Sequence, residues 1–281
     1  MTGAHQSSRV LLAALSSLLS VCPLAAAATS PPGMALVRGG SFKPFYAPSP
    51  DETTVTVQPF FLAKEPVTNR EFLQFVEARP KWRRDKVSRL FADHRYLKHW
   101  AEPTSLGSGA RPKQPVTNVS WFAAKSFCAY KNARLPTEME WEFAARASET
   151  SPDGTQDPAW TQRILGWYST PTTALLREVG QSKPNYWGVR DLHGLVWEWV
   201  SDFNSTLVSG DSRKTAQADK QTFCGAGALR ASDAKDYASF MRAAFRSSLR
   251  ASYTTKNLGF RCAKDVPKQK KQSKKQAAQK P

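Results

Sequence analysis

Three helix-start signals in the first half of the chain restrict the fold most, because each fixes where a short helix begins. Thr68 stands three residues before Glu71, and Thr137 stands three residues before Glu140. This is the spacing of a capping box, in which each partner satisfies a free backbone N–H of the other. Ser120 is a third N-cap residue, placed before a run with helical spacing of apolar side chains. We therefore predict helices over residues 69–78, 121–132 and 138–146.

The remaining sequence indicates strands and irregular segments. Residues 33–42 and 53–61 mix β-branched and aromatic residues between Gly and Pro boundaries, which predicts short strands. Helix signals fade after residue 150, and residues 185–199 place four aromatic rings around two glycines. With 15 Gly, 19 Pro and 11% aromatic residues, the composition favours a loop-rich domain with an aromatic core over a helical bundle. We expect a single α+β domain without an internal linker.

The N-terminus predicts export. Arg9 precedes an apolar run over residues 10–21, and small residues follow at 25–28, the layout of a secretory signal peptide. The run is too short to span a bilayer, which needs about 20 residues, and we expect no transmembrane segment elsewhere. We assign residues 1–28 to the signal peptide and expect a periplasmic or secreted protein. The alternative is a lipoprotein attached through Cys22.

The net charge of +17 is concentrated partly at the C-terminus, where residues 264–281 contain seven Lys and one Asp. A segment so poor in apolar residues should be disordered, and we assign residues 266–281 to a Lys-rich tail. The tail is either a solubilising terminus or a contact with the anionic envelope. We expect no nucleic-acid partner, because export removes the protein from the chromosome and no recognition motif is present.

Cysteine and histidine counts limit the chemistry. Removal of the signal peptide leaves Cys128, Cys224 and Cys262, an odd number in a compartment that permits disulfides. One disulfide and one spare thiol is the simplest outcome. The sequence has no CxxC or HExxH spacing, and we expect the remaining histidines to be structural or surface residues.

Six motifs follow one another along the chain. They are GGSF at 39–42, PVTN at 66–69, PVTNVSWFAAKSFCAY at 115–130, RLPTEMEWEFAAR at 134–146, YWGVRDLHGLVWEW at 186–199 and NLGFRC at 257–262. In these motifs the chain resembles the formylglycine-generating enzymes, also called sulfatase-modifying factors, over residues 33–265. The resemblance implies one compact α+β fold related to C-type lectins, which we assign to residues 29–265. It also implies a structural disulfide between Cys128 and Cys262.

The resemblance also implies a copper site that this sequence does not complete. The family's oxidase holds Cu(I) between two reactive cysteines, in a segment that corresponds to residues 228–241 here. Soft thiolates suit Cu(I), and this segment contains no cysteine. We therefore expect copper-dependent cysteine oxidation to be absent. The candidate catalytic residues are Cys224, Asp233 and Tyr237, and whether the protein is catalytic is left open; the spare thiol of Cys224 is either functional or simply buried.

Two further groups are candidate binding residues. The family builds a calcium site around G-N-x-W-E-W; here Leu195 replaces the Asn and Glu198 remains, so a backbone carbonyl and a carboxylate are the candidate ligands. The alternative for Glu198 is an ion pair with an arginine. Substrate-pocket candidates are Arg230, Lys235, Asp236, Arg242 and Arg246. For the last two, which are four residues apart, the alternative is a structural role in tying loops together.

These expectations leave three hypotheses about function. The first is an exported accessory or maturation factor that acts on a periplasmic client protein or peptide, such as a redox enzyme or a secretion component. The second is a cysteine-independent oxidoreductase of the same fold, of the kind the resemblance suggests for siderophore chromophore maturation. The third is a binding module with lectin-like topology and no catalysis.

Overall fold

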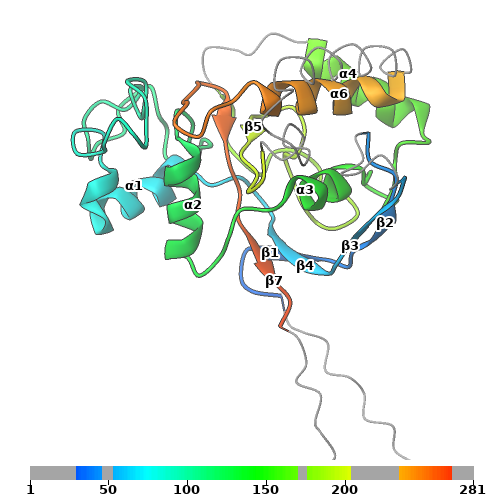
Figure 1. Ribbon diagram of the computed structural model, residues 1–281. Helices are drawn as coiled ribbons and strands as arrows, with labels where there is room; N and C mark the ends of the chain where they lie inside the picture. Colours follow the sequence, from blue (N-terminus) through cyan, green and yellow to red (C-terminus); the bar gives the residue numbers. More distant parts are fainter. Residues whose placement is uncertain (1–29, 46–52, 170–175, 204–233, 268–281) are drawn as a thin grey trace, which may run out of the picture.

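The computed structural model describes residues 30–45, 53–169, 176–203 and 234–267 (Figure 1). The predicted signal peptide and nearly all of the predicted Lys-rich tail lie outside these ranges. No helix among the described residues combines the length and the apolar character needed to cross a bilayer.

A three-stranded antiparallel sheet joins the two ends of the domain. β4 (Phe60–Ala63) is the central strand, with β1 (Met34–Val37) on one side and β7 (Ala263–Asp265) on the other. Leu62 faces Ala35 of β1 and Ala263 of β7 in this register. The first and last strands of the domain therefore lie beside the same central strand, as Figure 1 shows.

Two small sheets complete the β-structure. β2 (Gly40–Phe42) pairs antiparallel with β3 (Val55–Val57), and β5 (Trp197–Glu198) pairs parallel with β6 (Leu258–Gly259). Each of the two predicted strands is thus divided in two. Gly39 separates β1 from β2 at a φ of 73°, and a Cβ there would lie 2.3 Å from the Val57 carbonyl oxygen. Only glycine tolerates this turn and this approach, so one continuous strand cannot form.

The three predicted helix starts are confirmed. α1 (Asn69–Ala78) and α3 (Glu138–Ala145) begin with complete capping boxes, and Ser120 caps α2 (Trp121–Tyr130) by accepting from the Ala123 N–H. α1 is followed by a short 3₁₀ helix over Pro80–Trp82. α2 ends two residues earlier than predicted because Asn132 adopts a left-handed conformation, with a φ of 51°.

Two helices were not predicted. α4 (Pro158–Ser169) and α6 (Ala234–Ser247) lie side by side at the top of the molecule in Figure 1. Asp157 accepts a hydrogen bond from the Ala159 N–H at 2.9 Å, so α4 has an acidic N-cap before a proline. Buried Trp160, Ile164 and Ala238 form a small apolar cluster between the two helices.

The main core lies between α1, α2 and the last strands. The ring of Phe127 lies 5.7 Å from that of Phe72 and 5.4 Å from that of Phe260. The next residue, Cys128, forms a disulfide with Cys262, which is 134 residues away in the sequence. The structure therefore contains the disulfide that the family resemblance implies, and this disulfide joins α2 to the residue before β7.

Candidate functional site

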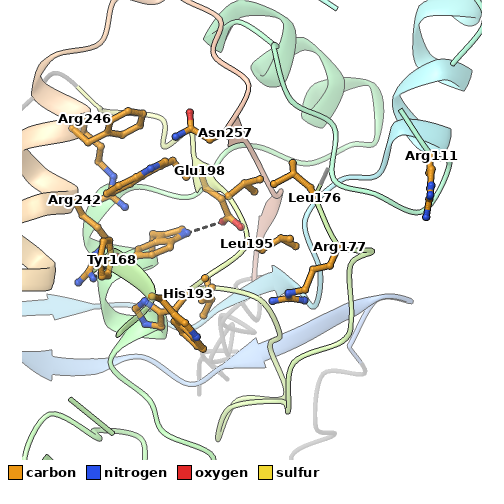
Figure 2. A pocket seen from close by; sticks show the side chains of 17 residues that line it. Arg111, Tyr168, Leu176, Arg177, His193, Leu195, Glu198, Arg242, Arg246 and Asn257 are labelled. Atoms are coloured by element: carbon orange, nitrogen blue, oxygen red, sulfur yellow. Dashed lines mark hydrogen bonds between the residues drawn. The ribbon is translucent and has the colours of Figure 1, made fainter. Parts of the chain in front are cut away.

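A cavity of about 540 Å³ opens among α3, α4, α6 and the β5 segment (Figure 2). Five aromatic side chains form much of its wall: Trp141, Trp167, Tyr168, Trp197 and Phe245. The rings of Trp197 and Phe245 stack at 4.4 Å, and Tyr168 lies 5.5 Å from Trp197. Rings from α4, β5 and α6 therefore make one continuous apolar surface, which suits flat or aliphatic groups of a ligand.

Buried charged side chains support this aromatic wall. The Arg242 guanidinium on α6 contacts both oxygens of Glu142 on α3, at 2.8 and 2.6 Å, and donates to the Tyr168 hydroxyl at 3.0 Å. Its side chain is only 6% exposed. This pair fixes α6 against α3 and holds the Tyr168 hydroxyl in place.

Arg246, one helical turn further along α6, joins the same cluster. It donates to Glu138 at 3.0 Å and to Glu142 at 2.7 Å, and its guanidinium lies 4.8 Å from the centre of the Trp141 ring. Residues four apart project from one face of a helix, which explains why both arginines reach α3. Figure 2 shows both side chains extending from α6 toward the cavity.

The two carboxylates of this cluster respond differently to burial. Burial opposes ionisation of Glu142, but the two arginines outweigh it and lower its pKa to about 2. Burial dominates at Glu138, where Arg246 is opposed by the nearby Glu142 and Asp202 charges, and its pKa is raised. Glu142 is therefore the stable anion of the cluster.

Glu198 forms a second buried ion pair, next to the indole N–H of Trp141. The Arg261 guanidinium contacts both Glu198 oxygens at 2.8 to 3.0 Å, and the Trp141 indole N–H donates to the same carboxylate at 2.7 Å (dashed line in Figure 2). Both side chains of the pair are fully buried. Arg261 also donates to the carbonyls of Ala63 and Lys64.

This geometry is the ion pair that the sequence analysis named as the alternative to calcium. Both Glu198 oxygens accept hydrogen bonds from protein donors, and the Leu195 side chain is buried beside the cavity. Among the described residues, no group of three or more His, Cys, Asp and Glu side chains could hold a metal ion. Calcium binding at Leu195 and Glu198 stays a prediction.

His193 is a buried histidine in the cavity wall. Its Nε2 lies 2.8 Å from the Ala145 carbonyl oxygen, which can only accept, so Nε2 carries the proton and Nδ1 is an acceptor. Nδ1 is buried and has no hydrogen-bond partner among the described residues. Burial, and next the Arg242 charge, lower the His193 pKa to about 3. The imidazole is therefore neutral at ordinary pH.

Trp167 covers this histidine. The two rings lie 5.7 Å apart, and the next residue, Gly194, has a φ of 79°. A Cβ on Gly194 would lie 2.7 Å from the Trp167 ring. Glycine is therefore required for Trp167 to lie over the His193 segment.

Two further arginines lie at the other end of the cavity (right of Figure 2). Arg177 forms an ion pair with Asp191 at 2.7 Å. The Arg111 side chain is exposed and has no ion-pair partner within the described part of the chain. This end of the cavity therefore offers a positive charge to a ligand.

The structure brings together four of the predicted site residues: Leu195, Glu198, Arg242 and Arg246 all line the cavity. Tyr237 is 42% exposed and is not among the cavity residues. Cys224, Arg230 and Asp233 lie outside the described residues, as do the side chains of Lys235 and Asp236. The sequence analysis missed the aromatic wall, His193, Arg111 and Arg177. The available signal for Trp141, His193 and Trp197 was the aromatic content of the motifs RLPTEMEWEFAAR and YWGVRDLHGLVWEW.

The thiols available in this chain do not fit a copper dithiolate. Cys128 and Cys262 are bonded to each other. The described part of the 228–241 segment belongs to α6, where buried Ala238 packs against α4. A Cu(I) site of the family's kind needs two thiolates together, and only Cys22 and Cys224 remain in the sequence.

Two sequence comparisons identify the family of this chain. Residues 22–266 match the Sulfatase-modifying factor enzyme 1-like domain. The chain is 33% identical over 250 residues to the Inactive C-alpha-formylglycine-generating enzyme 2 of Bos taurus, covering 74% of this chain and 78% of that protein. It is 30% identical over 282 residues to the Formylglycine-generating enzyme of Streptomyces coelicolor, covering 84% and 88%. The solved structure of PvdO from Pseudomonas aeruginosa is 18% identical, with a TM-score of 0.46, covering 83% of this chain and 94% of that one.

Proposed function

Because this chain belongs to the sulfatase-modifying factor family, which includes the formylglycine-generating enzymes, we propose that it uses the family fold to hold a client polypeptide and does not oxidise cysteine with copper. One observation carries this proposal. The segment in which the family places its copper cysteines has none here. Its described residues belong to α6, and Arg242 and Arg246 on the same helix support the cavity wall.

The cavity chemistry supports binding over acid–base catalysis. The Glu142 and Glu198 carboxylates are paired with arginines. His193 is a weak base, since its pKa is lowered to about 3. A general base works best with a pKa near the operating pH, and the buried His193 does not meet that condition. Aromatic rings and the exposed Arg111 instead offer apolar and charged contacts to a peptide.

Two further facts agree with this proposal. A relative 33% identical to this chain is named as an inactive formylglycine-generating enzyme. The N-terminal sequence has the layout of a signal peptide, so the client would be a periplasmic protein, with redox enzymes and secretion components as the classes to examine first. The protein would then act as an accessory or maturation factor.

Client capture with cavity variants tests this proposal. The exported protein is used as bait for periplasmic proteins of its own organism. The variants Trp197→Leu and Phe245→Leu are tested in parallel, because each replaces a ring of the wall by an aliphatic side chain. Tyr186→Leu is the matched control, because Tyr186 is 46% exposed and does not line this cavity.

We expect one client to be retained by the wild type and by the control, and to be reduced by both cavity variants at unchanged circular dichroism. Equal retention by all four proteins, or no retained client, would contradict the proposal.

A further inference from the structure

A strongly basic segment lies far from the cavity. Residues 79–98, which begin at the end of α1, contain eight Lys or Arg and two Asp. In Figure 1 this part of the chain lies beside α1, at the side of the molecule away from α4 and α6. Part of this charge is structural, because Arg83 pairs with Asp85 and Arg84 donates to the Trp100 and Ala101 carbonyls.

The tip of this segment exposes apolar side chains. Leu90 is 79% exposed and Phe91 is 44% exposed. Phe91 rests on the domain, because its ring lies 5.2 Å from that of Phe122 and 6.2 Å from that of Trp82. Leu90 therefore extends into solvent, and the residue next to it, Phe91, is packed against the domain.

Hydrogen bonds fix the tip in place. The Phe91 N–H donates to the Ser88 carbonyl at 2.9 Å, and the Leu90 N–H donates to the Ser88 hydroxyl at 3.3 Å. The Asp93 N–H donates to the Ser252 carbonyl at 2.9 Å, and the Asp93 carboxylate accepts from the Thr254 N–H at 3.0 Å. The tip therefore lies next to the loop around residues 250–256. This loop adds an exposed Tyr253, with the Arg250 guanidinium 5.7 Å from its ring.

Three cations of this surface have no acidic partner among the described residues. Lys86, Arg89 and Arg95 are exposed and make no ion pair with any described carboxylate. Of the two acidic residues, Asp85 is paired with Arg83 at 2.9 Å, and Asp93 is engaged by the Thr254 backbone. The surface therefore keeps a net positive charge around an exposed apolar tip.

We propose that this Leu90 surface, made of Lys86, Arg89, Leu90, Phe91, Arg95, Arg250 and Tyr253, binds the surface of an anionic phospholipid bilayer. Lys and Arg next to an anionic leaflet each strengthen binding by about fivefold. Leu90 reaches past the headgroups into hydrocarbon, and Tyr253 is of the residue type that prefers the interface. A bilayer presents phosphate groups above hydrocarbon. The unpaired cations of this surface would contact the phosphates, and the exposed Leu90 side chain would contact the hydrocarbon.

Vesicle co-sedimentation of the exported protein, which keeps the Lys-rich tail, tests this inference. Vesicles of phosphatidylcholine alone are compared with vesicles that also contain phosphatidylglycerol, at low and high salt. We expect binding to the anionic vesicles only, weakened by salt because screening reduces the attraction. The Lys-rich tail is present in every variant, so its contribution is constant.

Three variants separate charge from insertion. We expect Arg89→Gln to weaken binding about fivefold and Leu90→Ser to weaken it at least about tenfold, because an exposed leucine loses its burial in lipid. Leu90→Trp should tighten binding at an unchanged circular dichroism spectrum, which excludes misfolding as the cause. The double variant Lys183→Gln, Tyr186→Ser makes the same kinds of change at other exposed residues and should bind like the wild type.

Wild-type binding in Leu90→Ser, or no gain in Leu90→Trp, would overturn the inference. In that case a loss of vesicle binding in Arg89→Gln would show charge attraction to lipid without insertion of Leu90.

Discussion

Glu142 is the residue on which the cavity wall depends most, because it pairs with both arginines of α6. We predict that Glu142→Gln lowers the free energy of unfolding by about 3 to 5 kcal/mol, since it leaves two buried guanidinium groups with incomplete partners. Urea denaturation measures this change.

Glu149→Gln is the matched control. Glu149 pairs with Arg163 at 2.9 Å, but both side chains are well exposed, at 38% and 46%. A pair in water contributes little, so the expected change is under about 1 kcal/mol. Similar effects of the two substitutions would show that the buried cluster does not stabilise α6 against α3.

His193 gives the stability a pH dependence. Its pKa is lowered from an ordinary 6.5 to about 3, so the unfolded chain binds a proton that the native state excludes over that interval. The free energy of unfolding therefore falls as the pH is lowered from 6.5 toward 3. At pH 5 the contribution of this residue is about 2 kcal/mol relative to neutral pH.

Urea midpoints at pH 7 and pH 5 for the wild type and for His193→Gln check this prediction. The glutamine amide can still donate to the Ala145 carbonyl but cannot titrate. The pKa of His99 is also lowered, to about 4, but this residue contributes the same pH dependence of stability to both proteins. Between pH 7 and pH 5, the free energy of unfolding of the wild type should fall by about 2 kcal/mol more than that of the variant. An identical fall in both proteins would contradict the assignment.

At the scale of elements, the disulfide holds the end of the domain in place. It joins α2 to the residue before β7 across 134 residues of sequence. We predict that Cys128→Ala with Cys262→Ala lowers the free energy of unfolding by about 5 kcal/mol, mainly because the unfolded chain gains freedom. Cys224→Ser is the control for the loss of a thiol that does not belong to this disulfide. A double variant as stable as the control would contradict this role.

Sequence analysis predicted elements whose signals are local. Thr68 with Glu71 and Thr137 with Glu140 specify α1 and α3, because the capping partners are three residues apart. α4 also had a local signal, Asp157 before Pro158, but the surrounding Ser, Thr and Pro residues were interpreted as a loop. α6 was missed because the segment was interpreted only as the place of the family's cysteines.

Long-range pairings could not be predicted from the residues alone. Arg242 and Glu142 are 100 residues apart in sequence, and Arg261 and Glu198 are 63 apart. The chain has many arginines and several carboxylates, so local patterns do not determine which ones pair. The aromatic cavity wall could not be predicted for the same reason, because its rings come from four separate elements.

At the scale of the whole molecule, the proposed functions occupy separate surfaces. The cavity lies under α4 and α6, and the Leu90 surface lies beside α1 on another side of the domain (Figure 1). A client in the cavity would therefore leave the lipid-binding residues free. The positive charges of the chain therefore differ by location: the buried arginines of the cavity are paired with carboxylates, whereas the exposed cations of the Leu90 surface and the Lys-rich tail contribute to the net charge of +17.

The copper chemistry is tested most directly by a formylglycine assay. The purified protein is incubated with Cu(I), oxygen and a sulfatase peptide that contains the client cysteine, with the Formylglycine-generating enzyme of Streptomyces coelicolor as the positive control. Mass spectrometry measures conversion of the cysteine to the aldehyde. We predict no conversion, because this chain lacks the thiolate pair that the reaction requires. Aldehyde formation by the wild type that is lost in Cys224→Ser would contradict the central claim.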